Sequence, residues 1–170
     1  MGLVNGKVCL VTGGASNPGL GHAIAHKLAS EGAIVIVTDV DGDGAERTAA
    51  EITAQGGQAQ AWAQDVTDEA LWDQTFDRIR AEHGKIDALI NNAGISMRSM
   101  FETVDLAVLK QVMDINFWGT VYATHAALPH IKAVKGGIIG ISSIAGYRGL
   151  PVRTGYSASK FATSTKRSSI

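Results

Sequence analysis

The sequence has a single cysteine and no long hydrophobic run, and each absence excludes a class of protein. Cys9 has no partner for an internal disulfide, and its place in the apolar residues 8–11 indicates a buried strand residue rather than a nucleophile. No apolar stretch reaches the roughly 18 residues that suggest a transmembrane helix. Residues 1–7 lack the hydrophobic region of a signal peptide, so we predict a cytoplasmic protein.

The chain also has little excess charge, with a formal net charge of −1 at pH 7. This value gives no electrostatic reason to expect nucleic acid or an anionic membrane as a partner, and we predict neither. No metal site is predicted. The 170 residues have the length of one domain, and no linker, repeat or low-complexity segment divides them. We therefore predict a single domain over residues 1–170.

Short apolar segments alternate with longer segments of helical pattern, which is the order of a βαβ protein. Val, Ile and Leu fill most of the apolar segments without polar alternation, as expected for parallel strands covered on both faces. The sequence predicts a doubly wound α/β fold of the Rossmann type. The expected strands are residues 7–12, 33–38, 58–63, 86–90 and 137–142.

Start and stop signals locate the first two helices. We expect one helix over residues 22–30, ended by Gly32 in the position after the helix. The second should open with a capping box formed by Asp43 and Glu46 and close at residues 56–57, which are both glycine.

Two further helices should follow. The third opens at residues 67–69 and ends before Gly84, with an apolar face made of Trp72, Phe76 and Ile79. The fourth, over roughly residues 105–130, is apolar nearly all round until Pro129 disturbs its end. Such a helix must be buried, either by the sheet and a neighbouring helix or by another subunit.

A glycine-rich turn, Thr-Gly-Gly-Ala-Ser-Asn-Pro-Gly-Leu-Gly at residues 12–21, joins the first expected strand to the first expected helix. Glycines allow backbone N–H groups to approach a pyrophosphate, and the helix N-terminus adds a partial positive charge. The position between strand and helix makes this turn a candidate dinucleotide site. The residues predicted to contact a cofactor here are Gly13, Ser16, Gly19, Leu20 and Gly21.

Asp39 ends the second expected strand, where a carboxylate can accept hydrogen bonds from both hydroxyls of an adenosine ribose. The same charge would repel a 2′-phosphate, and residues 13–21 contain no Lys or Arg that could neutralise one. NAD is therefore predicted as the cofactor in preference to NADP. The alternative is a solvated aspartate in a turn.

Two more segments follow expected strands at the same edge of the sheet. Asp65 and Val66 are placed to meet the adenine, although an aspartate before a helix is an equally ordinary structural choice. Residues 91–94, Asn-Asn-Ala-Gly, follow the fourth strand, where small residues allow a cofactor to lie against the backbone. A plain strand-to-helix turn would explain that segment nearly as well. The predicted cofactor contacts in it are Asn92, Ala93 and Gly94.

Tyr156 and Lys160 are four residues apart in the run Gly-Tyr-Ser-Ala-Ser-Lys. If residues 155–165 are helical, the two side chains share one face, one turn apart. A phenol ionises near pH ~10, and a nearby positive charge favours its anion. Such a tyrosine can exchange the proton of an alcohol while another group moves a hydride. The same spacing also occurs as a solvated pair on ordinary helices.

Together these motifs resemble the short-chain dehydrogenase/reductase family over residues 3 to about 162. The turn at residues 12–21 and the Asn-Asn-Ala-Gly segment are similar to family signatures, as is the Tyr156–Lys160 pair. The resemblance implies a catalytic set in which Asn116, within Asp-Ile-Asn-Phe-Trp-Gly, and Ser143 join this pair. Ser142 is then a structural neighbour.

The resemblance also implies a role for each residue of this set. Tyr156 exchanges the proton of the substrate hydroxyl, and Ser143 hydrogen-bonds to the same oxygen. Lys160 favours ionisation of the tyrosine and holds the nicotinamide ribose, while Asn116 positions a water that links Lys160 to solvent. Tyr156 and Lys160 thus also belong to the cofactor site. The implied reaction transfers a hydride between a secondary alcohol or ketone and NAD.

Two features depart from the family pattern. The glycine-rich turn is longer than usual, with residues 14–18 between its glycine groups, and Pro18 removes one N–H donor. Family domains are also longer than this chain, so the resemblance implies a truncated member without the last two strands and the segment that covers the substrate. The polar residues 163–170 do not continue an amphipathic helix, and the fifth strand would be a bare edge.

Three functions stay open at this point. The first is an NAD-dependent alcohol dehydrogenase or carbonyl reductase acting on a small molecule. The second is a catalytically incomplete NAD-binding module or a fragment of a longer dehydrogenase. The third, a sugar-nucleotide epimerase or dehydratase, shares the Tyr-x-x-x-Lys pair. The apolar helix and the resemblance predict a homo-oligomer, dimer or tetramer. The substrate itself is not predicted.

Overall fold

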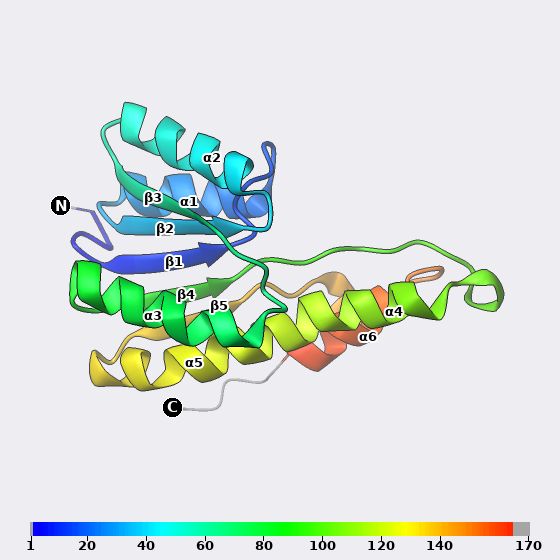
Figure 1. The fold of residues 1–170 in the computed structure, drawn as a ribbon. Coiled ribbons are helices and arrows are strands. Elements are labelled where there is room, and N and C mark those ends of the chain that lie inside the picture. Colours follow the sequence, from blue (N-terminus) through cyan, green and yellow to red (C-terminus); the bar gives the residue numbers. More distant parts are fainter. Residues whose placement is uncertain (1, 165–170) are drawn as a thin grey trace.

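The fold is built on a five-stranded sheet in which all neighbouring strands are parallel. In the computed structural model, which describes residues 2–164, the strand order is β3-β2-β1-β4-β5 (Figure 1). The prediction of a Rossmann-type parallel α/β fold is confirmed, and each strand lies within two residues of its expected bounds. The strands are β1 Val8–Thr12, β2 Ile34–Asp39, β3 Gln58–Ala63, β4 Ala88–Asn91 and β5 Gly137–Gly140.

The strand order reverses at β1, which pairs with β2 on one side and with β4 on the other. The loops that follow β1 and β4 therefore leave the sheet toward opposite faces. In an open parallel sheet this reversal creates a crevice at the carboxyl ends of the strands, where ligands commonly bind.

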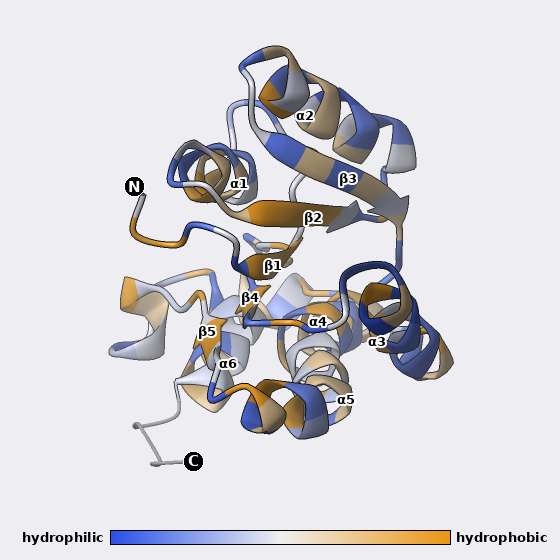
Figure 2. Ribbon diagram, turned by 90° about the vertical axis from the view of Figure 1, so that its left-hand side faces the viewer, coloured by the Kyte–Doolittle hydropathy of each residue, from blue (hydrophilic) through white to orange (hydrophobic). Residues whose placement is uncertain are grey.

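Alternate residues of β1 enter two separate cores, because successive side chains of a strand point to opposite faces. Val8 and Leu10 pack with α3 (Glu69–His83) and α5 (Gly119–Ala133). Cys9 and Val11 pack with α1 (Leu20–Ser30) and α2 (Gly42–Ala54). Figure 2 shows hydrophobic β1 and β2 between α1 on one side and α3 on the other. Burial raises the pKa of the Cys9 thiol to about 11, which agrees with the prediction of a structural cysteine.

Helix ends are partly as predicted. Gly32 follows α1 with φ +89°, and Gly84 ends α3 with φ +76°, conformations that favour glycine. The predicted capping box of Asp43 and Glu46 is wrong. Asp41 caps α2 instead, and its side chain accepts a hydrogen bond from the Gly44 N–H at 3.0 Å. Asp43 already lies inside the first turn of α2, so its carboxylate is not placed to cap it.

The apolar segment at residues 105–130 is not one regular helix. It consists of α4 (Leu106–Met113), a π-helical turn (Asp114–Trp118) and α5, which continues past Pro129 to Ala133. Within this chain only one side of the segment packs inward, so burial of the other side by another subunit, the alternative left open by the sequence, stays a prediction. Its inward residues include Val112, Ala123, Ala127 and Ile131, whereas Leu106, Val108 and Trp118 are exposed.

The last described elements are short. A 3₁₀ turn (Ile144–Gly146) follows β5, and α6 (Thr154–Thr163) packs against α4. Another 3₁₀ turn, Phe101–Thr103, precedes α4. Within the described residues β5 pairs only with β4, and its Ile139 is 52% exposed, as predicted for a bare edge.

The predicted polar tail extends into residues 165–170, which lie outside the described residues. Across residues 2–164, no helix has the length and apolar character to cross a membrane.

Candidate active site

A cavity of about 630 Å³ opens at the carboxyl edge of the sheet, where β1 and β4 diverge. Every residue predicted to contact the cofactor, apart from Tyr156 and Lys160, lines it. These residues are Gly13, Ser16, Gly19, Leu20, Gly21, Asp39, Asp65, Val66, Asn92, Ala93 and Gly94. A second cavity, of about 530 Å³, adjoins it at Asp65, Gln111 and Ile115 but has no part of the glycine-rich turn in its wall.

The glycine-rich turn packs closely against the end of β4. Gly13 has φ +69°, and a Cβ atom at this position would lie 2.7 Å from the Cα of Ala93. A Cβ atom at Gly21 would overlap with the carbonyl oxygen of Gly13, at the point where α1 begins. Only glycine allows both close approaches, and they bring the N-terminus of α1 to the wall of the cavity.

Asn92 holds this turn in place. Its side-chain amide donates hydrogen bonds to the carbonyl oxygens of Thr12 and Gly13, each at 2.9 Å. The backbone N–H groups of Asn92 and Ala93 donate to the hydroxyl oxygen of Thr12 at 3.0 and 2.9 Å. Asn92 thus contributes to the cavity by fixing its shape, with its amide already engaged. Sequence analysis did not single out Thr12, whose hydroxyl organises the same junction.

The carboxylate of Asp39 is oriented by two backbone groups. One oxygen accepts from the Ala15 N–H at 2.9 Å and the other from the Asp41 N–H at 3.1 Å. Each carboxylate oxygen can accept a further hydrogen bond, so a ribose hydroxyl could still bind. Among the described residues that line the cavity there is no Lys or Arg.

Asn116 lies in the π-helical turn and is buried. Its side-chain oxygen accepts from the Ile95 N–H at 2.8 Å, and its amide donates to the Ile95 carbonyl at 2.9 Å and to the Ser159 hydroxyl at 2.9 Å. A π-helical turn inserts an extra residue into a helix and often marks a functional site. Here it places the Asn116 side chain between α6 and the segment that follows β4.

Lys160 is buried on α6, and its ammonium donates to the Ile141 carbonyl at 2.8 Å. Burial lowers the pKa of Lys160 from its ordinary value. That is its one hydrogen bond as a side-chain donor within residues 2–164, so two of the three ammonium hydrogens stay available for a ligand. A Cβ atom added to Gly94 would lie 3.7 Å from this ammonium, so Lys160 approaches the wall of the cavity.

Tyr156 is half-buried one turn before Lys160, whose ammonium lies 5.9 Å from the centre of the tyrosine ring. The two side chains therefore share one face of α6, as their spacing predicts. Ser143 lies at the end of the segment after β5, where its hydroxyl accepts from the Ala145 N–H at 3.2 Å. Ser142 instead bonds to the Ser164 hydroxyl at 2.8 Å and so joins this segment to the end of α6.

Ser159 is a supporting residue that sequence analysis missed. It is fully buried, accepts from Asn116 and donates to the Tyr156 carbonyl at 2.8 Å. Its position directly before Lys160 was visible in the sequence, but its link to Asn116 depends on the packing of α6. The cavity has further lining residues that were not predicted as cofactor contacts, namely Val40, Gln64, Ile95, Gln111 and Ile115.

The parallel sheet with its crevice at the strand reversal defines a Rossmann-type α/β protein. The chain belongs to the short chain dehydrogenase family, because the family model described by that name matches residues 7–167. Members of this family are oxidoreductases that use a nicotinamide cofactor.

Known proteins similar to this chain include dehydrogenases and a reductase. The cyclopentanol dehydrogenase of Comamonas testosteroni is 41% identical over 161 residues, which cover 94% of this chain and 64% of the relative. The 3-oxoacyl-[acyl-carrier-protein] reductase FabG of Thermotoga maritima is 33% identical over 158 residues, 92% of this chain and 63% of the relative. The 11-beta-hydroxysteroid dehydrogenase-like 4A of Arabidopsis thaliana is 35% identical over 161 residues, 94% of this chain and 53% of the relative. The chain thus spans 53–64% of the length of these relatives.

Proposed function

We propose that this chain is the NAD-binding and catalytic part of an oxidoreductase that interconverts a secondary alcohol and a ketone. The observation that carries the proposal is the cavity at the strand reversal, which gathers the glycine-rich turn, Asp39 and the segment after β4 in one wall. The relatives named as alcohol and hydroxysteroid dehydrogenases support the same reaction class. The proposed unit is a single domain over residues 1–170.

The wall of the cavity supports NAD as the cofactor rather than NADP. The N-terminus of α1 and the N–H groups of residues 13–21 offer a site for the pyrophosphate. Asp39, Asp65 and Val66 line the same cavity. Asp39 would accept the hydroxyls of the adenosine ribose, and Asp65 and Val66 would hold the adenine. The negative charge of Asp39 disfavours a 2′-phosphate.

The proposed proton transfer uses the residues of α6 and the segment after β5. Tyr156 takes the proton of the alcohol or returns it to the ketone oxygen, and the Ser143 hydroxyl donates a hydrogen bond to that oxygen. The Lys160 ammonium lies 5.9 Å from the centre of the Tyr156 ring. Its hydrogens that do not bond to Ile141 would hold the nicotinamide ribose. Asn116 braces the segment after β4 against α6 and is proposed to position a water beside Lys160. Bound NAD supplies the hydride acceptor, and NADH the donor.

The proposal is tested by incubating the protein with NADH and a panel of cyclic and acyclic ketones. We expect at least one apolar ketone to be reduced while NADH is oxidised. The loss of NADH absorbance measures the reaction. Oxidation of secondary alcohols by NAD gives the reverse check. Absence of turnover with every ketone and alcohol would contradict the catalytic part of the proposal.

A second candidate is an NAD-binding module without turnover. The chain spans 53–64% of the length of the relatives named above, so the similarity supports the dinucleotide-binding part more directly than turnover. Saturable NADH binding together with no turnover would support the module. A sugar-nucleotide epimerase, which shares the Tyr156–Lys160 pair, would instead interconvert a sugar nucleotide with no net change in NADH.

We also propose that the chain forms a homo-oligomer, dimer or tetramer. Leu106, Val108 and Trp118 are exposed on α4 and the following turn, and apolar side chains grouped on one helical segment often mark an interface. Sedimentation velocity at micromolar concentration would test this, and a monodisperse monomer would contradict it.

A further inference from the structure

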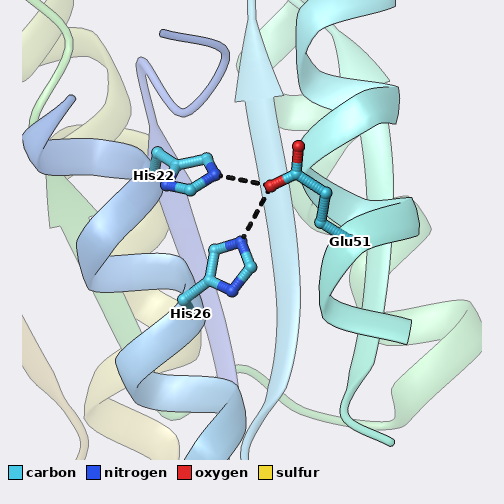
Figure 3. A group of neighbouring side chains, drawn as sticks. All are labelled: His22, His26 and Glu51. Carbon is cyan, nitrogen blue, oxygen red and sulfur yellow. Dashed lines mark hydrogen bonds and ion pairs between the residues drawn. The ribbon is translucent and has the colours of Figure 1, made fainter. Parts of the chain in front are cut away.

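Two histidines and a glutamate meet between α1 and α2. His22 and His26 lie on successive turns of α1, and both rings point toward the carboxylate of Glu51 on α2 (Figure 3). The side chains of His22 and His26 are 16% and 19% exposed, so both rings are largely buried. The Glu51 side chain is 44% exposed, so an ion from solvent can reach the group. None of the three lines the cofactor cavity or takes part in the proposed reaction.

One distance within this cluster matches that between neighbouring ligands of a tetrahedral metal ion, and the other is that of a hydrogen bond. Nε2 of His22 lies 2.8 Å from Oε2 of Glu51, and Nε2 of His26 lies 3.4 Å from the same oxygen. One ligand atom from each residue can be chosen so that all three lie within 4.8 Å of one another. Zinc holds imidazole nitrogen and carboxylate oxygen at about 2.0–2.2 Å, which places neighbouring tetrahedral ligands roughly 3.4 Å apart. Small side-chain rotations would therefore let one ion contact all three residues.

Gln55 prepares His26 for such an ion. Its side-chain oxygen lies 3.3 Å from Nδ1 of His26, and in the tautomer with its proton on Nδ1 the ring donates to Gln55 and has its lone pair on Nε2. A hydrogen bond of this kind orients most metal-binding histidines. Nε2 is enclosed, and none of residues 2–164 hydrogen-bonds to it. It lies 3.4 Å from Oε2 of Glu51, and either a proton on Nε2 or a metal ion shared with the carboxylate would make this contact favourable.

We propose that His22, His26 and Glu51 bind a divalent transition-metal ion of the zinc type, which joins α1 to α2. Two imidazoles and one carboxylate suit Zn²⁺, whereas Mg²⁺ and Ca²⁺ prefer sites made of oxygen ligands. A fourth position stays open to water, as in many sites with three protein ligands. The ion would stabilise the helix pair whether or not the chain catalyses a reaction.

Isothermal titration of the tag-free protein with ZnCl₂ in a buffer that does not chelate metals tests the site. We expect saturable binding of one Zn²⁺ per chain, a Zn²⁺-dependent rise in Tm that EDTA reverses, and no such response to MgCl₂. Buried Cys9 does not compete for the ion, because burial disfavours its thiolate. Absence of saturable binding at millimolar Zn²⁺ would overturn the proposal and leave a simple hydrogen-bonded pair of His22 and Glu51.

Three separate variants assign the ligands. His22→Gln, His26→Gln and Glu51→Gln should each weaken Zn²⁺ binding about tenfold or more, since loss even of an outer partner of a metal site commonly costs 10–100-fold. His125→Gln, at an exposed histidine of α5, is the matched control and should bind as the wild type does. Far-UV circular dichroism verifies that each variant is folded. Zn²⁺ binding of wild-type strength in all three variants would place the ion elsewhere and overturn the assignment.

Discussion

Tyr156 and Lys160 are the residues on which the proposed chemistry depends most. Their separation along α6 places the ammonium 5.9 Å from the ring centre, and the Ile141 carbonyl fixes the position of the ammonium. Within residues 2–164 the hydrogen bond between Tyr156 and Ser159 uses the Tyr156 backbone carbonyl and not its phenol. In the proposed mechanism the phenol is left to exchange a proton with the substrate oxygen.

Tyr156→Phe should remove proton exchange without disturbing the cofactor site. We expect kcat to fall about 10²–10⁴-fold, the usual contribution of a general acid or base, while NADH affinity stays within about twofold. Steady-state rates with the best ketone and a fluorescence titration of NADH measure the two quantities. Loss of NADH binding and turnover together would mean that Tyr156 has a structural role.

Asp39→Ala should change cofactor selectivity. The Ala15 and Asp41 N–H groups hold the carboxylate in the cavity wall. Removing it deletes the proposed ribose acceptor and the charge proposed to disfavour a 2′-phosphate. We expect weaker binding of NADH and relatively tighter binding of NADPH, with the preference changed about tenfold or more, as loss of a charge-assisted hydrogen bond predicts. If the ratio of the NADH and NADPH dissociation constants is unchanged in the variant, Asp39 does not determine the cofactor preference.

At the scale of elements, the start of α1 depends on its glycines. Gly21→Ala would place a methyl group against the Gly13 carbonyl oxygen. This oxygen belongs to the backbone, so it cannot move aside as easily as the end of a flexible side chain. We expect a loss of about 1–3 kcal/mol in the free energy of unfolding and weaker NADH binding. Gly149→Ala is the matched control, because a Cβ atom there meets no other atom within 4 Å. Equal urea denaturation and NADH titration curves for the two variants would show that the close approach has no effect.

Asp87 connects β1 and β4 at the amino ends of these strands, opposite the cavity. It is buried, accepts from the Val8 N–H at 2.9 Å, and its two oxygens lie 2.9 Å from the ammonium groups of Lys7 and Lys85. Burial alone would raise the pKa of Asp87, but the hydrogen bonds from Lys7, the Val8 N–H and Lys85 outweigh it and hold the pKa below its usual value. The ionised carboxylate is thus favoured by the folded state.

The pKa of Asp87 is lower in the folded than in the unfolded chain, where it is ~3.9. The stabilisation by Asp87 is therefore fully present above this unfolded pKa and is lost as the pH falls through the folded pKa. Asp87→Asn should lower the free energy of unfolding by about 1–3 kcal/mol at neutral pH. The difference from wild type should shrink as the pH falls below ~4. Urea denaturation at a series of pH values measures it, and a difference independent of pH would contradict this account.

The elements also show how far the sequence predicts the structure. Strand positions and the glycine-rich turn were predictable, since apolar runs and close-approach glycines are local signals. The cap of α2 was placed at Asp43 instead of Asp41, because both aspartates have a cap-like sequence and only the backbone conformation separates them. The π-helical turn around Asn116 has no local signal, as it depends on the contacts of Asn116 with Ile95 and Ser159.

At the scale of the whole molecule, sites formed across elements were the hardest to predict. The cofactor cavity was predictable because parallel strands all end at the same edge, so loops far apart in sequence must meet there. The cluster of His22, His26 and Glu51 was not, because it depends on how α1 and α2 lie against each other. The half-exposed face of α4 and the following turn likewise became visible only once the buried residues were known.

The central claim is that the cavity at the strand reversal binds NAD, and an equilibrium titration with NADH tests it most directly. Enhanced, blue-shifted NADH fluorescence that saturates at one molecule per chain, and that NAD reverses by competition, is the predicted result. The Gly21→Ala variant is titrated in parallel, and its weaker NADH binding would show that NADH binds in this cavity. No saturable binding by the folded wild-type protein, or equal binding by wild type and Gly21→Ala, would contradict the claim.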